Sequence, residues 1–123
     1  MNHDDVRVVV VDDVADAAEA LAAALELSGY KVWIATGGKE ALALIDERRP
    51  HCVLLDVGMP GMDGFELTQE LRNRYGDDIV LIAVTGREKD DERVSGTFAR
   101  VDHYLQKPVD PDVLKKLLPP LDD

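Results

Sequence analysis

Short apolar runs recur along the chain, and they are rich in valine, isoleucine and leucine. Runs of this length without polar alternation are typical of strands that are buried on both faces of a parallel sheet. We expect four such strands and a shorter fifth one, at residues 6–11, 31–36, 52–57, 79–84 and 103–106.

Segments with helical periodicity separate these strands. Over residues 15–28, apolar positions between Ala18 and Leu25 recur on one face, and Gly29 follows where a helix end favours a left-handed residue. Similar patterns predict further helices at 39–48, where Pro50 ends the helix, and at 65–74, 88–100 and 111–118. The helix over 88–100 has the weakest pattern, because the serine, glycine and threonine at 95–97 are poor helix formers.

Strands that alternate with helices at this spacing form βαβ units, which build a parallel sheet with helices on both faces. The fold class is therefore α/β, a single doubly wound (βα)5 domain. The right-handed crossover rule favours a five-stranded sheet of order 2-1-3-4-5, the flavodoxin-like arrangement. With 123 residues, we expect one domain over 1–123, with its core in 6–118 and no output domain in this chain.

Composition narrows the classes of function. Apolar residues make up 46% of the chain and charged residues 32%, a balance typical of globular domains. The net charge of −11 argues against direct binding of nucleic acid. No apolar run approaches the length of a membrane span, and the N-terminus lacks the features of a secretory signal, so we expect a cytoplasmic location. Cys52 is the only cysteine, and we interpret it as a buried apolar residue.

Polar side chains gather where the predicted strands end. Asp12 and Asp13 follow the first strand, Asp56 lies at the end of the third, Thr85 follows the fourth and Lys107 follows the fifth. Each residue alone could be a helix cap, a turn residue or a solvated charge. The carboxyl ends of parallel strands meet at one edge of the sheet, however, and ligands bind there. We therefore interpret these five residues as one site.

This combination also indicates a chemistry. Three carboxylates in one partly buried site repel one another and need a compensating cation. Oxygen ligands without histidine or thiol favour a hard ion, and Mg²⁺ suits two or three carboxylates. A magnesium ion beside a carboxylate, an amine and a hydroxyl suits phosphoryl transfer, in which one carboxylate can act as the nucleophile.

Four segments carry a resemblance to a known family. "VVVVDD", "LLDVGMPGMDGFEL", "IAVTG" and "HYLQKPVDPDVL" resemble, in order and spacing, the receiver domain of bacterial two-component response regulators. The resemblance covers residues 6–118. It implies a signalling switch rather than an enzyme, in which Asp56 accepts a phosphoryl group from a histidine kinase or a histidine phosphotransfer protein.

The resemblance also implies a role for each residue of the metal site. Asp13 and Asp56 would bind Mg²⁺ directly, together with the backbone carbonyl of Gly58. Asp12 would act on the ion through a bound water molecule.

A second group of residues would sense the phosphoryl group. Lys107 would neutralise its oxygens, Thr85 would supply a hydroxyl that moves toward it, and Tyr104 would turn inward behind that hydroxyl. The output surface would consist of the fourth helix, the fifth strand and the fifth helix, and it would contact a downstream protein effector.

Two other classes remain as alternatives. A phosphohydrolase of the haloacid dehalogenase type also uses an aspartate nucleophile after a strand, but it needs a second aspartate two positions later, where this chain has Gly58. Release of phosphate from small phosphoesters would favour that class. A flavin or nucleotide-binding module has the same fold, but Asp12 and Asp13 would repel a phosphate without its metal. Tight nucleotide binding without Mg²⁺ would favour that class.

Overall fold

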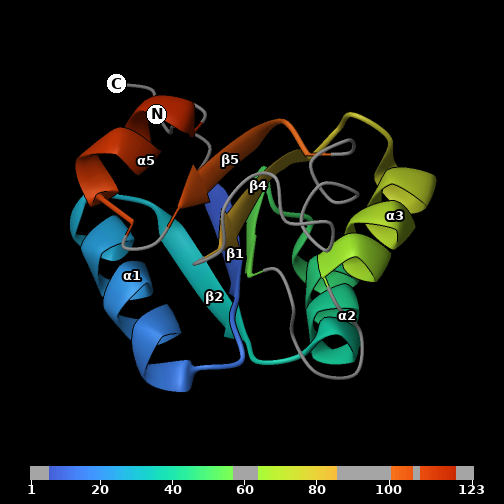
Figure 1. Ribbon diagram of the computed structural model, residues 1–123, viewed down its shortest axis with the longest axis horizontal. Helices are drawn as coiled ribbons and strands as arrows, with labels where there is room; N and C mark the ends of the chain where they lie inside the picture. The colour runs from blue at the N-terminus through green and yellow to red at the C-terminus, as the bar shows by residue number, and fades with distance from the viewer. Residues whose placement is uncertain (1–5, 57–63, 86–100, 107–108, 119–123) are drawn as a thin grey trace.

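The protein folds as a parallel sheet covered by helices on both faces, in the computed structural model shown in Figure 1. The structure describes residues 6–56, 64–85, 101–106 and 109–118. The helix predicted over 88–100 lies outside these residues.

The sheet has five strands, and every pair of neighbours is parallel. Their order is β2-β1-β3-β4-β5, which confirms the predicted order. The strands are β1 (Arg7–Val11), β2 (Lys31–Ala35), β3 (Cys52–Asp56), β4 (Val80–Thr85) and β5 (His103–Gln106). All of them correspond to predicted strands, with bounds that differ by no more than one residue.

Four helices are described, and they form two layers. They are α1 (Ala15–Leu27), α2 (Gly38–Arg48), α3 (Gly64–Tyr75) and α5 (Pro111–Leu117). Figure 1 shows α1 and α5 on one face of the sheet and α2 and α3 on the other. The longest described helix, α1, has 13 residues, and no helix in the described ranges is long and apolar enough to cross a membrane.

The valine run of β1 explains the two layers, because alternate side chains of a strand point to opposite faces. Val9 and Val11 pack in the cluster beneath α2 and α3, and Val8 and Val10 pack in the cluster beneath α1 and α5. All four are buried, since both faces of this central strand are covered. Cys52 belongs to the second cluster and is buried, which confirms its predicted role.

Helix ends lie at the positions that the sequence indicates. Gly29 follows α1 with a positive φ of 105°, as predicted. Arg49 ends α2 in the left-handed region (φ 48°), directly before Pro50, whose ring disfavours helical backbone at the preceding residue. Gly76 ends α3 with a φ of 57°, which costs a glycine little because it lacks a Cβ. These ends return the chain to the amino edge of the sheet after each helix.

Candidate functional site

Three carboxylates meet at the carboxyl edge of the sheet, across β1 and β3. Val11 of β1 pairs in register with Leu55 of β3, so the next residues, Asp12 and Asp56, lie side by side where the two strands end. Together with Asp13 they offer three carboxylate oxygens that all lie within 4.8 Å of one another. The predicted convergence of these three acids is therefore observed.

Backbone groups hold Asp12 in place. Its side chain is almost fully buried, and its Oδ1 accepts a hydrogen bond from the Val14 N–H at 2.9 Å. Its own N–H donates to the Ala35 carbonyl of the neighbouring strand at 3.1 Å. Asp13, by contrast, is exposed, and Asp56 is half-buried. Asp12 is thus the fixed, buried member of the cluster, and Asp13 is the member open to solvent.

The three carboxylates share a small volume, so their negative charges repel one another. The start of α1 at Ala15 offsets part of this charge, since free N–H groups and the positive end of a helix dipole lie at a helix N-terminus. The donor set fits a hard divalent cation. Oxygens bound to one octahedral Mg²⁺ lie about 3 to 4 Å apart, which is compatible with three oxygens that all lie within 4.8 Å of one another. This acidic triad of Asp12, Asp13 and Asp56 could therefore bind a metal ion.

The strand register brings further predicted site residues to the same edge. Val84 of β4 pairs with Asp56, so Thr85 ends β4 one residue beyond the cluster. Thr85 in turn pairs with Gln106, the last residue of β5. The structure describes the backbone of Thr85 only, and both Gly58 and Lys107 lie outside the described residues.

Tyr104, the predicted switch residue, lies in the middle of β5. It pairs in register with Ala83, and it is half-buried.

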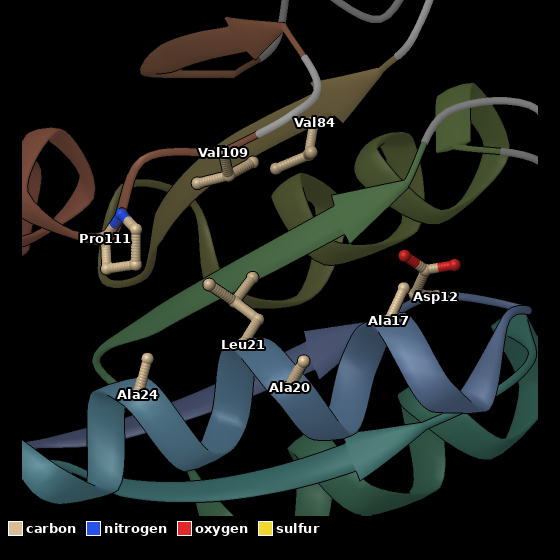
Figure 2. A pocket seen from close by; sticks show the side chains of 8 residues that line it. All are labelled: Asp12, Ala17, Ala20, Leu21, Ala24, Val84, Val109 and Pro111. Carbon is tan, nitrogen blue, oxygen red and sulfur yellow. The ribbon is translucent and has the colours of Figure 1, made fainter.

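An apolar groove opens beside the cluster, and the sequence reasoning missed it. Figure 2 shows side chains of α1 on one side of this groove and Val84, Val109 and Pro111 on the other, with Asp12 at one end. Its volume is about 530 Å³, and α1 contributes Ala17, Ala20, Leu21 and Ala24. The sequence feature that could have indicated this groove is the set of small alanine side chains at positions 17, 20 and 24, beside the buried face of the predicted helix.

The fold, the register and the acidic triad together define the class of protein. The response regulator receiver domain family matches residues 8–119, and the chain belongs to this family. It is a receiver domain of a two-component system, a signalling switch rather than an enzyme, and its acidic cluster is consistent with a phosphoacceptor site. Membership in this family decides against the phosphohydrolase and the nucleotide-binding module.

Among curated proteins, the chain is similar to the response regulator MprA of Mycolicibacterium vanbaalenii. The two are 46% identical over 103 residues, which cover 84% of this chain and 44% of MprA. The chain thus spans about half the length of the curated relatives it matches.

Two solved structures show the same fold. A CheY-like receiver domain from Methanospirillum hungatei superposes with a TM-score of 0.84 at 32% identity, and the match covers 93% of this chain and 91% of that one. The response regulator TrrA from Thermotoga maritima superposes with a TM-score of 0.76 at 30% identity, over 91% of this chain and 98% of that one. TrrA was solved in complex with Mg²⁺ and BeF.

Proposed function

We propose that Asp56 is the phosphoacceptor of a phosphorelay and that its reaction requires Mg²⁺. The observation that carries the proposal is the acidic triad, three carboxylate oxygens within 4.8 Å of one another at the carboxyl ends of β1 and β3. Asp56 is the member that ends a strand and is half-buried, so it combines a fixed position with access for a donor. The crystallised complex of TrrA with Mg²⁺ and BeF supports the same assignment.

In this proposal a carboxylate oxygen of Asp56 attacks the phosphorus of a phosphohistidine on a histidine kinase or a histidine phosphotransfer protein. A P–O bond forms while the P–N bond breaks, and the electron pair of the broken bond stays on the imidazole nitrogen. A bound Mg²⁺ supplies positive charge next to the oxygens of the transferred group. Asp13, Asp56 and the Gly58 carbonyl would hold this ion, and Asp12 would hold it through water.

The remaining predicted site residues would respond to the phosphorylation of Asp56. Lys107 would bind the phosphoryl oxygens, and Thr85 and Tyr104 would change position in response to the two or so added charges. The changed surface on the predicted fourth helix, β5 and α5 would then contact a downstream protein effector. We place this exchange in the cytoplasm.

The groove beside Asp12 supports a protein donor. A donor that brings a phosphohistidine to Asp56 must cover the adjacent surface, and the apolar groove along α1 is continuous with the acidic cluster through Asp12. Substitution Ala20→Arg should block the groove with a long charged side chain. We expect slower transfer from autophosphorylated histidine kinases of the source organism and an unchanged reaction with acetyl phosphate. If the wild type and the Ala20→Arg variant accept phosphoryl groups from such kinases at equal rates, the groove does not bind the donor.

The experiment that tests the phosphoacceptor role is incubation with acetyl phosphate and Mg²⁺, followed by intact mass spectrometry. The wild-type chain should gain one acid-labile phosphoryl group, and EDTA should prevent the gain. The Asp56→Asn variant should gain none, whereas Asp16→Asn, an equal charge change in the first turn of α1, should react like the wild type. A wild-type chain that stays unmodified would contradict the proposal, as would an Asp56→Asn variant that reacts normally.

A further inference from the structure

The strand that leads to Lys107 is weakly specified by its own side chains. β5 has four residues, none of them fully buried, and it pairs only with β4 in the described part of the chain. Register is poorly fixed where a short strand lies at a sheet edge and buries little. A slip by one residue would shift the strand end by about 3.3 Å and turn each side chain to the opposite face. Leu105 of β5 packs against the core cluster beneath α1 and α5, and a contact outside the strand would add to what fixes its register.

Asp102, the residue directly before β5, provides such a contact. Its N–H donates to the Leu81 carbonyl at 2.8 Å, and its Oδ2 accepts from the Leu81 N–H at 2.8 Å. The side chain thus completes a closed two-bond pairing with β4, one position before the first regular pair of the ladder, Ile82 with His103. A slip of β5 would break both bonds at once.

Arg72 of α3 fixes the same carboxylate from the other side. Its Nη2 donates to Asp102 Oδ2 at 2.9 Å, and its Nη1 donates to the carbonyls of Gly76 at 2.8 Å and Ile79 at 3.0 Å. The Arg72 side chain is only 14% exposed, whereas the Asp102 side chain is 42% exposed. One guanidinium therefore ties the end of α3, the start of β4 and the start of β5 together.

We propose that Arg72 and Asp102 are positioning residues for the phosphoryl-transfer reaction, because they fix the register of β5 on β4. This inference rests on the proposed function of Lys107, which follows β5 directly in the sequence. Asp102 lies five residues before Lys107, about 16 Å along an extended chain, so neither residue of the pair touches the phosphoryl group. Their effect on the reaction is carried by the strand.

The test separates metal binding from phosphoryl binding in the Asp102→Ala variant. Asp12 and Asp13 directly follow β1, and Asp56 ends β3, so the variant should bind Mg²⁺ with unchanged affinity by calorimetry. Binding of beryllofluoride and the rate of reaction with acetyl phosphate should fall by about tenfold, because misplacement of a catalytic group by an ångström or more has effects of this size or larger. The milder variant Asp102→Asn should lose less than Asp102→Ala.

The matched control is Asp46→Ala. Asp46 also pairs with an arginine of α3, Arg74, and its side chain is 42% exposed, the same as that of Asp102. It joins α2 to α3 and contacts no residue of β5 in the bonds described here. We expect this variant to keep wild-type binding of beryllofluoride.

The outcomes distinguish the two proposals. If the wild type reacts and the Asp102 variants behave like Asp46→Ala, the positioning role is wrong and the phosphoacceptor role stands. If the wild type does not react at all, the proposed function fails first. If Asp102→Ala does not fold, Asp102→Asn and Arg72→Lys decide. Beryllofluoride affinity that stays at the wild-type value in both of these variants would overturn the inference.

Discussion

Charged side chains are arranged differently at the two edges of the sheet. At the amino edge, Arg7 donates to the carbonyls of Arg48 at 2.9 Å and Arg49 at 2.7 Å, and Arg72 binds two carbonyls and a carboxylate. At the carboxyl edge, the carboxylates of Asp12, Asp13 and Asp56 offer oxygens that lie within 4.8 Å of one another. Matched charges stabilise a fold, whereas gathered like charges weaken it until a ligand arrives. The amino edge therefore contributes mainly to stability, and the carboxyl edge mainly to function.

The largest expected effect is on metal binding at the acidic edge. Asp13→Asn should weaken Mg²⁺ binding on the order of 100-fold, because even residues that only support a ligand contribute 10- to 100-fold. Calorimetric titration measures this. Asp16→Asn changes the charge by the same amount in the first turn of α1, and it should bind Mg²⁺ nearly as well as the wild type. A similar loss in both variants would mean that general charge, and not a site, attracts the ion.

At the arginine edge we expect a loss of stability instead. Arg72→Ala leaves the carbonyls of Gly76 and Ile79 without this donor, and it should lower the free energy of unfolding by about 2 kcal/mol. Urea denaturation measures the change. Arg74→Ala removes a more exposed side chain and should cost less. If Arg72→Ala left stability unchanged, the contrast between the edges would not hold.

A smaller effect of opposite sign is expected for Asp12→Asn. The amide oxygen can still accept from the Val14 N–H, while one of three like charges disappears. In EDTA the variant should be more stable than the wild type by about 1 kcal/mol. Saturating Mg²⁺ should reverse the order, because the wild type binds the ion more tightly. A variant less stable than the wild type in EDTA would show that the cluster carries no strain.

The smallest expected effect is on the stability of the protein at low pH. Partial burial acts to raise the pKa of Asp102, but the Leu81 N–H and the Arg72 guanidinium outweigh it, so the pKa lies below its ordinary value. A lowered pKa in the folded state stabilises the protein above the ordinary aspartate pKa of about 4, and this contribution is lost as pH falls through the folded value. The stability difference between wild type and Asp102→Asn should therefore shrink below pH of about 4. Denaturation curves at several pH values check this, and a constant difference would contradict it.

Periodicity predicted the layers of the fold because each strand is buried on both faces. Val8 to Val11 could form only a central strand, and the order of the sheet followed from the crossover rule. The convergence of Asp12, Asp13 and Asp56 was predictable for the same reason, since parallel strands place their carboxyl ends at one edge.

Contacts between distant segments were not predictable. Arg72 and Asp102 are separated by 30 residues, and nothing in either local pattern indicates that one binds the other. The groove along α1 depends on how α1 packs beside β4 and the start of α5, which periodicity does not specify. Such features follow from the packing of elements, and a single sequence records them only as ordinary arginines, aspartates and alanines.

The central claim is that the three carboxylates have different roles: all three contribute to metal binding, and Asp56 alone receives the phosphoryl group. Reduction of the phosphorylated chain with borohydride converts an aspartyl phosphate to homoserine, and peptide mass spectrometry then locates it. We predict homoserine at position 56 and unmodified aspartate at positions 12 and 13. Homoserine at Asp12 or Asp13, or at none of the three, would contradict the account.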